Sequence, residues 1–175
     1  MLKQIGVSFR VIPSEADETN TTGLQPAEYV KQCALAKAKA VAAQGNQDDI
    51  VIGADTVVAL AEVMFGKPTG AVDAVQMLQK LSGRTHSVWS GLAVLAPQRS
   101  FVTAVETKVT LAELSAQQIE RYVASGEPLD KAGAYAIQGL GAVFVKRIDG
   151  CYYNVVGLPL QLLSGQLNEL GVLLP

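Results

Sequence analysis

Asp55 is the residue of this sequence whose surroundings most need a chemical explanation. It lies inside "DDIVIGADTVVAL" (residues 48–60), a run rich in Val and Ile of the kind that forms a buried or half-buried strand. A carboxylate in such a run must find hydrogen-bond donors, a cation or water, because an ionised group buried without a partner is heavily penalised. Asp55 therefore has either a structural partner or a chemical role.

Two lysines also occupy unusual positions. Lys37 belongs to a stripe of mostly apolar residues at helical spacing within residues 30–41, so it extends from a face that should be buried. Lys67 lies between a glycine and a proline in "FGKPTG". Taken singly, Lys37 is explained as a lysine that reaches water from the edge of a helix face, and Lys67 as a solvated loop lysine.

Two further candidates lie in segments that read as loops. Glu18 belongs to the acidic run "SEADETN", and Gln138 belongs to the glycine-rich segment "DKAGAYAIQGLGA" (residues 130–142). Glycines at this density let a backbone approach a ligand closely or turn sharply. Lysines can meet phosphate oxygens, and carboxylates can hold a hard cation such as Mg²⁺. The residues together suggest a site for a metal-bound polyanion, although neither a Walker loop nor a dinucleotide-binding fingerprint is present.

The elements that must position these residues alternate between strands and helices. The sequence patterns predict strands at residues 6–13, 48–60, 85–95 and 105–111, helices at 26–44 and 71–81, a helix after the Ser115–Gln118 capping box, a hairpin at 142–156 around Asp149-Gly150, and a last helix from Pro159 to about Gly171. This alternation predicts an α/β fold with a mixed sheet in one continuous domain, residues 1–175.

Composition excludes several other classes of protein. The chain has 175 residues, enough for one sizeable core, and 49% of them are hydrophobic, which excludes a disordered or fibrous chain. It has no apolar run of membrane-spanning length and no signal-peptide pattern, so we expect a cytoplasmic protein. A net charge of −2 without a basic block argues against a nucleic-acid or membrane partner. Cys33 and Cys151 lack metal-site spacing and are expected to be reduced thiols, and His86 lacks a partner motif.

Five segments in order resemble the Maf family of nucleoside triphosphate pyrophosphatases: "GADTVV", "GKP", "KLSGRTHSVWSG", "SGEPLDKAGAYAIQG" and "YYNVVGLPL". The similarity extends from residue 2 to about residue 165. It implies a fold like that of the inosine triphosphate pyrophosphatases, an elongated mixed sheet flanked by helices with a cleft between two lobes. It also implies hydrolysis of the bond between the α- and β-phosphates of a nucleotide, with a divalent cation (Mg²⁺ or Mn²⁺), to cleanse the nucleotide pool.

The resemblance gives the unusual charged residues roles in catalysis. Asp55 matches the family's proposed general base, which would take a proton from a water bound to Mg²⁺, and Glu18, Lys37 and Lys67 match other catalytic positions. Asp55 and Glu18 are also the candidate metal ligands. The two lysines would stabilise the charge that grows on the triphosphate.

The resemblance also implies a substrate. Thr56 and Gln138 match positions linked to base selection, and "GADT" followed later by "AIQG" is similar to the branch of the family that prefers dTTP and UTP. A nucleoside triphosphate is therefore the expected partner molecule, with a homodimer as one option for assembly. Two alternatives stay open: a non-catalytic nucleotide-binding regulator linked to cell division arrest, and an enzyme of the same class that acts on purines such as ITP.

The sequence departs from the family pattern at two places. The family normally begins with a strand and a phosphate-binding Ser-x-Ser-x-Arg-Arg segment, whereas "MLKQIG" matches the end of the helix that follows. We therefore expect a domain shortened at its N-terminus, through a late start codon or a true truncation, and weak activity of residues 1–175 alone. The second departure is Ala61-Glu62, which stands where the family has a hairpin turn of the Asp-Gly type.

Overall fold

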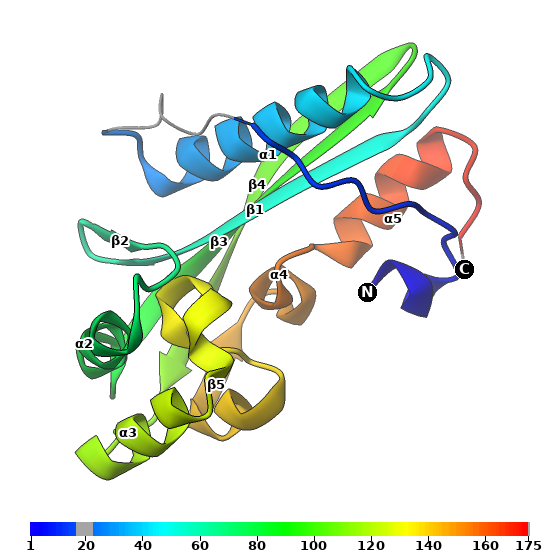
Figure 1. The fold of residues 1–175 in the computed structure, drawn as a ribbon. Coiled ribbons are helices and arrows are strands. Elements are labelled where there is room, and N and C mark those ends of the chain that lie inside the picture. Colours follow the sequence, from blue (N-terminus) through cyan, green and yellow to red (C-terminus); the bar gives the residue numbers. More distant parts are fainter. Residues whose placement is uncertain (17–22, 175) are drawn as a thin grey trace. The chain divides into compact units, whose positions relative to one another are not determined.

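Five strands form one open sheet in the order β2-β1-β3-β4-β5 (Figure 1). The structure is a computed structural model that describes residues 1–16 and 23–174. The strands are β1 (Val51–Leu60), β2 (Val63–Phe65), β3 (Thr85–Ala96), β4 (Arg99–Leu111) and β5 (Val145–Asp149). Residues 61–62 join β1 to β2, and residues 97–98 join β3 to β4. Connections this short pair neighbouring strands antiparallel, because a parallel pair needs a long crossover.

The expected α/β fold is confirmed, but the sheet of the described strands is antiparallel and not mixed. In the β1–β2 pair Ala59 lies opposite Met64, and in the β4–β5 pair Val109 lies opposite Ile148. The β1–β2 hairpin forms although it lacks the Asp-Gly turn, because Ala61 takes a left-handed conformation with φ 51°. An alanine in that conformation carries a steric cost that glycine avoids.

Helices connect and cover the strands. The α-helices are α1 (Pro26–Ala42), α2 (Ala71–Leu81), α3 (Ala116–Ala124), α4 (Tyr152–Val156) and α5 (Leu160–Glu169), and the short 3₁₀ helices are η1 (Leu2–Ile5), η3 (Glu127–Asp130), η4 (Ala132–Ala134) and η5 (Gly139–Phe144). The predicted capping box at the start of α3 is confirmed by both of its hydrogen bonds. The Gln118 amide donates to Ser115 Oγ at 3.3 Å, and the Ser115 amide donates to Gln118 Oε1 at 2.9 Å. None of the described helices is long and apolar enough to cross a membrane.

The chain divides into two compact units. The first unit comprises residues 1–55, 90–105 and 157–175, and the second comprises residues 56–89 and 106–156. The divisions fall inside the long strands, so β1, β3 and β4 each contribute residues to both units. Asp55 is the last β1 residue of the first unit, and Thr56 is the first residue of the second.

In the first unit, α1 packs along the strands through small side chains (Figure 1). Ala34 and Ala38 of α1 and Ala93 of β3 form a buried cluster. Two glycines make the approach close. A Cβ atom on Gly91 would lie 2.0 Å from the Val30 carbonyl oxygen, and one on Gly53 would lie 2.3 Å from the Ala34 carbonyl oxygen. Close packing of this kind lets few side chains substitute for glycine.

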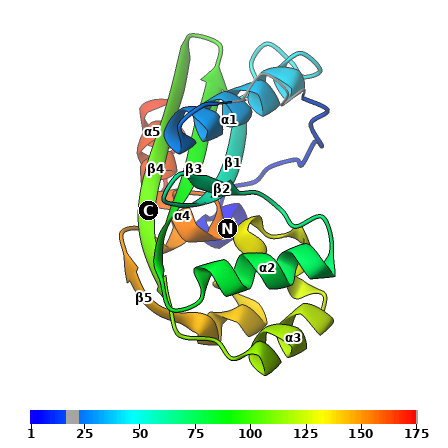
Figure 2. The same ribbon diagram turned by 90° about the vertical axis from the view of Figure 1, so that its left-hand side faces the viewer.

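In the second unit, α2 and α3 lie side by side and share one apolar core (Figure 2). The fully buried members of that core with the largest side chains are Leu78, Leu81, Val88, Val109, Leu111 and Ile119. The helical spacing that predicted α2 is confirmed to the residue, because Ala74, Leu78 and Leu81 all face this core.

Two predicted elements are wrong. Residues 6–13 form no strand, and Phe9 and Val11 are 42% and 79% exposed. An alternating apolar pattern stabilises a strand only where a neighbouring strand and a core receive it. The hairpin at residues 142–156 is also absent, since β5 ends at Asp149 and α4 begins at Tyr152.

Side-chain contacts explain why a helix replaces the second strand of that hairpin. A Cβ atom on Gly150, which has φ 131°, would lie 2.8 Å from Thr107 Oγ1, so β4 crowds the turn. Buried Asn154 then fixes α4 by donating from Nδ2 to the Val88 carbonyl at 3.0 Å and to Thr107 Oγ1 at 3.1 Å. These polar contacts depend on residues distant in sequence, and the Asp-Gly signal therefore failed here.

Candidate functional site

Lys37 and Asp55 form an ion pair inside the first unit. Lys37 Nζ on α1 donates to Asp55 Oδ1 on β1 at 2.5 Å. The Lys37 side chain is 30% exposed and the Asp55 side chain is 13% exposed, so both groups are half-buried yet remain open to solvent. The structural partner that a carboxylate in this strand requires is therefore a lysine.

The packing of α1 explains why these two side chains meet. Gly53 and Asp55 are two residues apart in β1, so they lie on the same face of the sheet. Gly53 lies directly beneath Ala34 and Ala38 of α1. Lys37 is one helical turn from Ala34 and therefore lies on the same side of α1. Because Gly53 has no side chain, α1 packs close to β1, and this brings Lys37 within hydrogen-bonding distance of Asp55.

The pair has the two properties that phosphate hydrolysis needs from side chains. The carboxylate of Asp55 is an acceptor that can take a proton from a nearby water. The ammonium group of Lys37 carries three donors, so it can hold Asp55 and also meet a phosphate oxygen. The arrangement can therefore orient a base and supply positive charge at one place.

Asp55 is the candidate metal ligand that lies among the described residues. Among residues 1–16 and 23–174, no group of three or more His, Cys, Asp or Glu side chains could hold a metal ion. Asp55 offers one carboxylate, and the other candidate ligand, Glu18, lies outside the described residues. One or two carboxylates together with substrate phosphates are the usual way in which proteins bind Mg²⁺, so Asp55 fits this role.

Lys67 lies in the second unit, next to the glycine-rich segment. The Gly133 amide donates to the carbonyl of Gly66 at 3.0 Å, which ties the turn that carries Lys67 to η4. Asp130 also lies nearby: its hydrogen bond with Lys131 at 2.7 Å and, to a smaller extent, the charge of Lys67 lower the pKa of its carboxyl group. The second unit thus places Lys67 beside the glycine-rich segment, which itself contains Lys131.

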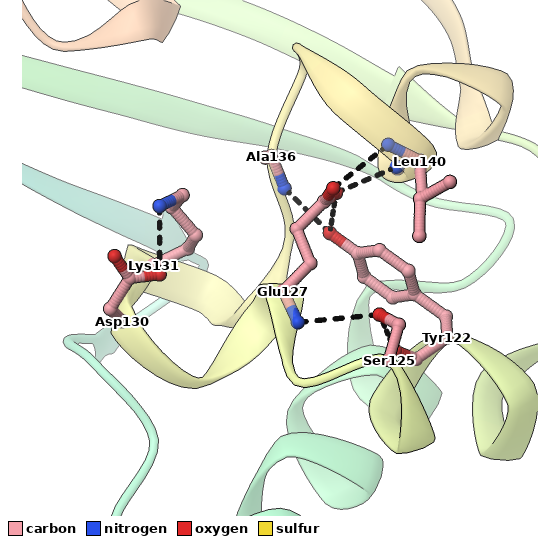
Figure 3. A network of polar contacts seen from close by, with 8 residues as sticks. Tyr122, Ser125, Glu127, Asp130, Lys131, Ala136 and Leu140 are labelled. Atoms are coloured by element: carbon pink, nitrogen blue, oxygen red, sulfur yellow. Dashed lines mark hydrogen bonds and ion pairs between the residues drawn. The ribbon is translucent and has the colours of Figure 1, made fainter.

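Gln138 is exposed and immediately precedes η5. Two side chains, Glu127 and Tyr122, hold the backbone near Leu140 and at Ala136, on either side of it in the sequence (Figure 3). Glu127 accepts hydrogen bonds from the amides of Leu140 and Gly141 at 2.9 and 3.0 Å. Tyr122 accepts one from the amide of Ala136 at 3.0 Å. The sequence analysis gave no role to Glu127 or Tyr122, although "SGEPLDKAGAYAIQG" is one of the segments that resemble the family.

The structure thus brings together some of the predicted site residues. Lys37 and Asp55 meet in the first unit, whereas Thr56, Lys67 and Gln138 belong to the second. Thr56 follows Asp55 in β1, and successive side chains of a strand point to opposite faces.

His86 and the two cysteines are buried or half-buried in this fold. His86 is buried, and its Nε2 atom shares a hydrogen bond of 2.8 Å with the hydroxyl of Tyr135. Burial lowers the pKa of His86 to about 4. Cys33 is buried, Cys151 is half-buried, and neither forms a disulfide, as the sequence predicted.

Comparison with known proteins supplies the family to which the chain belongs. Residues 1–170 match the Maf family, described as Maf-like protein. A dTTP/UTP pyrophosphatase of Bacillus cereus (strain AH820) is 45% identical over 172 residues, which cover 98% of this chain and 90% of that protein. A dTTP/UTP pyrophosphatase of Dictyoglomus thermophilum is 48% identical over 174 residues, again covering 98% of this chain and 90% of the relative. The chain belongs to the Maf family.

Proposed function

We propose that this protein is a nucleoside triphosphate pyrophosphatase that acts on dTTP and UTP and releases a nucleoside monophosphate and pyrophosphate. The observation that carries this proposal is the 45 to 48% identity, over 98% of the chain, to proteins named dTTP/UTP pyrophosphatase. The half-buried pair of Asp55 and Lys37 supports it with chemistry suited to the reaction.

Asp55 acts as the general base in this proposal. A water oxygen attacks one phosphorus of the α–β anhydride, the bridging P–O bond breaks, and the nucleoside monophosphate and pyrophosphate are the two products. The proton of the water passes to the Asp55 carboxylate, which Lys37 holds in place at 2.5 Å. The positive charge of Lys37 beside this carboxylate would reduce the cost of the negative charge that grows on the phosphates.

A divalent cation completes the proposed site. Bound through Asp55, and through Glu18 outside the described residues, it would supply positive charge at the triphosphate and make water there more acidic. Lys67 adds a second point charge for the phosphates. Lysines serve this purpose as positioned charges and not as bidentate partners.

Gln138 and Thr56 are the proposed base-selecting residues. Gln138 is supported by its exposed position on a segment whose backbone is fixed on both sides. An amide side chain presents both a donor and an acceptor, so it can pair with the edge of a pyrimidine. A base that leaves such a group unpaired is rejected more strongly than one that differs only in size.

A pyrophosphate-release assay on the full chain tests the proposal. The panel contains dTTP, UTP, CTP, ATP, GTP and ITP, each with Mg²⁺ or Mn²⁺. We expect kcat/KM to be highest for dTTP and UTP, and the products to be the monophosphate and pyrophosphate. Higher efficiency with ITP or GTP would overturn the substrate assignment, and binding without any hydrolysis would show a nucleotide-binding protein and not an enzyme.

A further inference from the structure

The carboxylate of Glu127 is the central acceptor of a polar network in the second unit (Figure 3). Its Oε2 atom accepts from the amide of Leu140 at 2.9 Å, and its Oε1 atom accepts from the amide of Gly141 at 3.0 Å. The Tyr122 hydroxyl donates to the same Oε1 atom at 2.9 Å. Three donors thus converge on one ionised group, and such charge-assisted bonds are the stronger kind.

Tyr122 extends this network to the other side of Gln138. Its hydroxyl oxygen accepts from the amide of Ala136 at 3.0 Å while its proton is given to Glu127. The Tyr122 ring packs edge-on against Phe144 with 5.0 Å between ring centroids, which holds the phenol in place. The backbone is therefore anchored two residues before Gln138 and again two and three residues after it.

The glycines of this segment fit around the two side chains. A Cβ atom on Gly139 would lie 2.4 Å from Glu127 Oε2, and one on Gly141 would lie 2.6 Å from the Tyr122 hydroxyl. Gly139 also has φ 80°, which other residues adopt at a cost. Residues 136–141 thus have the shape that the Glu127–Tyr122 pair requires, and this pair fixes the backbone on both sides of Gln138.

We infer that Glu127 is a positioning residue that holds Gln138 in the orientation that selects the base, acting through Tyr122 and the amides of Leu140 and Gly141. This inference rests on the proposed function, because it assigns base selection to Gln138. Glu127 itself contacts backbone and a phenol, so its effect should fall on discrimination between nucleotides and less on the rate with the best substrate.

Glu127→Gln tests the inference with minimal change in shape. A glutamine offers one acceptor oxygen where Glu127 uses two, so its amide NH₂ group must face a backbone donor. Glu120→Gln is the matched control, because Glu120 is exposed on α3, two residues before Tyr122 in the sequence, and its replacement changes the net charge equally. Tyr122→Phe is a second test variant, which keeps the ring and removes only the hydroxyl.

Two quantities are measured for each variant. The first is the ratio of kcat/KM for dTTP to that for GTP, and the second is amide hydrogen exchange of residues 136–141 without nucleotide. Loss of one charge-assisted hydrogen bond predicts that Glu127→Gln lowers the ratio about ten-fold and speeds exchange at least as much. The Glu120→Gln values should match the unmodified protein, and kcat for dTTP should fall less than the ratio does.

A folded Glu127→Gln variant with an unchanged ratio, or with unchanged exchange at Leu140 and Gly141, overturns the inference. If Glu127→Gln does not fold, Tyr122→Phe tests the inference instead. Its readouts are the same ratio of kcat/KM for dTTP to that for GTP and amide hydrogen exchange at Ala136. If the unmodified protein hydrolyses no nucleotide, the proposed function fails, and the ratio of Kd values for dTTP and GTP replaces the kinetic ratio. In that case equal Kd ratios in the unmodified protein and the variant still overturn the inference.

Discussion

Gly91 lies so close to Val30 that a Cβ atom on the glycine would be 2.0 Å from the valine carbonyl oxygen. This contact joins β3 to the first turns of α1, the helix that carries Lys37. The distance between α1 and the sheet is therefore set by backbone-to-backbone contact. The Lys37–Asp55 pair depends on that distance, because both members project from the two surfaces that meet there.

Gly91→Ala should destabilise the protein strongly for this reason. The added methyl group meets backbone, which cannot rotate away, so α1 must move and we expect a loss of roughly 2 kcal/mol or more in the free energy of unfolding. Urea unfolding followed by circular dichroism measures it. Gly165→Ala on α5 is the matched control: nothing lies within 4 Å of its Cβ position, and the change should be neutral or stabilising. Equal effects of the two substitutions would contradict the packing account.

His86 should make stability depend on pH in a defined range. Burial lowers its folded-state pKa to about 4 from an ordinary value of 6.5, so the unfolded chain binds the proton first as pH falls. The contribution of neutral His86 to the free energy of unfolding is complete above pH 6.5 and is lost progressively between pH 6.5 and 4. At 1.36 kcal/mol per unit of pKa difference the loss is about 3 kcal/mol.

The comparison that isolates this effect is His86→Gln, which keeps a hydrogen-bonding side chain and cannot titrate. Urea unfolding at several pH values measures the difference in the free energy of unfolding between the unmodified protein and His86→Gln. This difference should change by about 3 kcal/mol between pH 6.5 and 4. Since the chain has one histidine, its ring resonances can be followed directly by NMR. A titration midpoint near 6.5 in the folded protein would refute the assignment.

Elements with strong local signals were predictable from the sequence. The bounds of α2 and the capping box of α3 follow from helical spacing and from Ser115 with Gln118. The predictions failed where contacts between residues distant in the sequence determine the local structure. Asn154 bonds to Val88 and Thr107, far away in sequence, and turns an apparent hairpin into α4.

The candidate site was predictable to a similar extent. Asp55 and Lys37 were recognisable as unusual for a buried strand and a buried helix face, and they do meet. The hydrogen bonds of Glu127 were not recognisable from the sequence, because two of its three donors are backbone amides, which residue types do not reveal. Only the crowding of Gly139 and Gly141 against side chains reveals why glycines occur there.

Gln138→Ala should reduce base selection more than it reduces the best rate. Losing its hydrogen bonds to the base is expected to narrow the ratio of kcat/KM between dTTP and CTP or GTP by about ten-fold. The assay is pyrophosphate release across the nucleotide panel. Gln117→Ala, at an exposed position on α3, is the control and should leave the ranking intact. A Gln138→Ala protein with the ranking of the unmodified protein would remove Gln138 from the base site.

The central claim, that Asp55 is the general base, is tested most directly by single-turnover hydrolysis of dTTP by Asp55→Asn. The substitution keeps the shape of the side chain and removes its ability to take a proton, so the rate should fall by about 10²–10⁴-fold. Asp48→Asn, a change of the same kind at an exposed position before β1, should retain the rate of the unmodified protein. Nucleotide binding and folding of the Asp55→Asn protein should persist. A folded Asp55→Asn protein that hydrolyses dTTP at a near-normal rate would contradict the account and leave Asp55 only as the structural partner of Lys37.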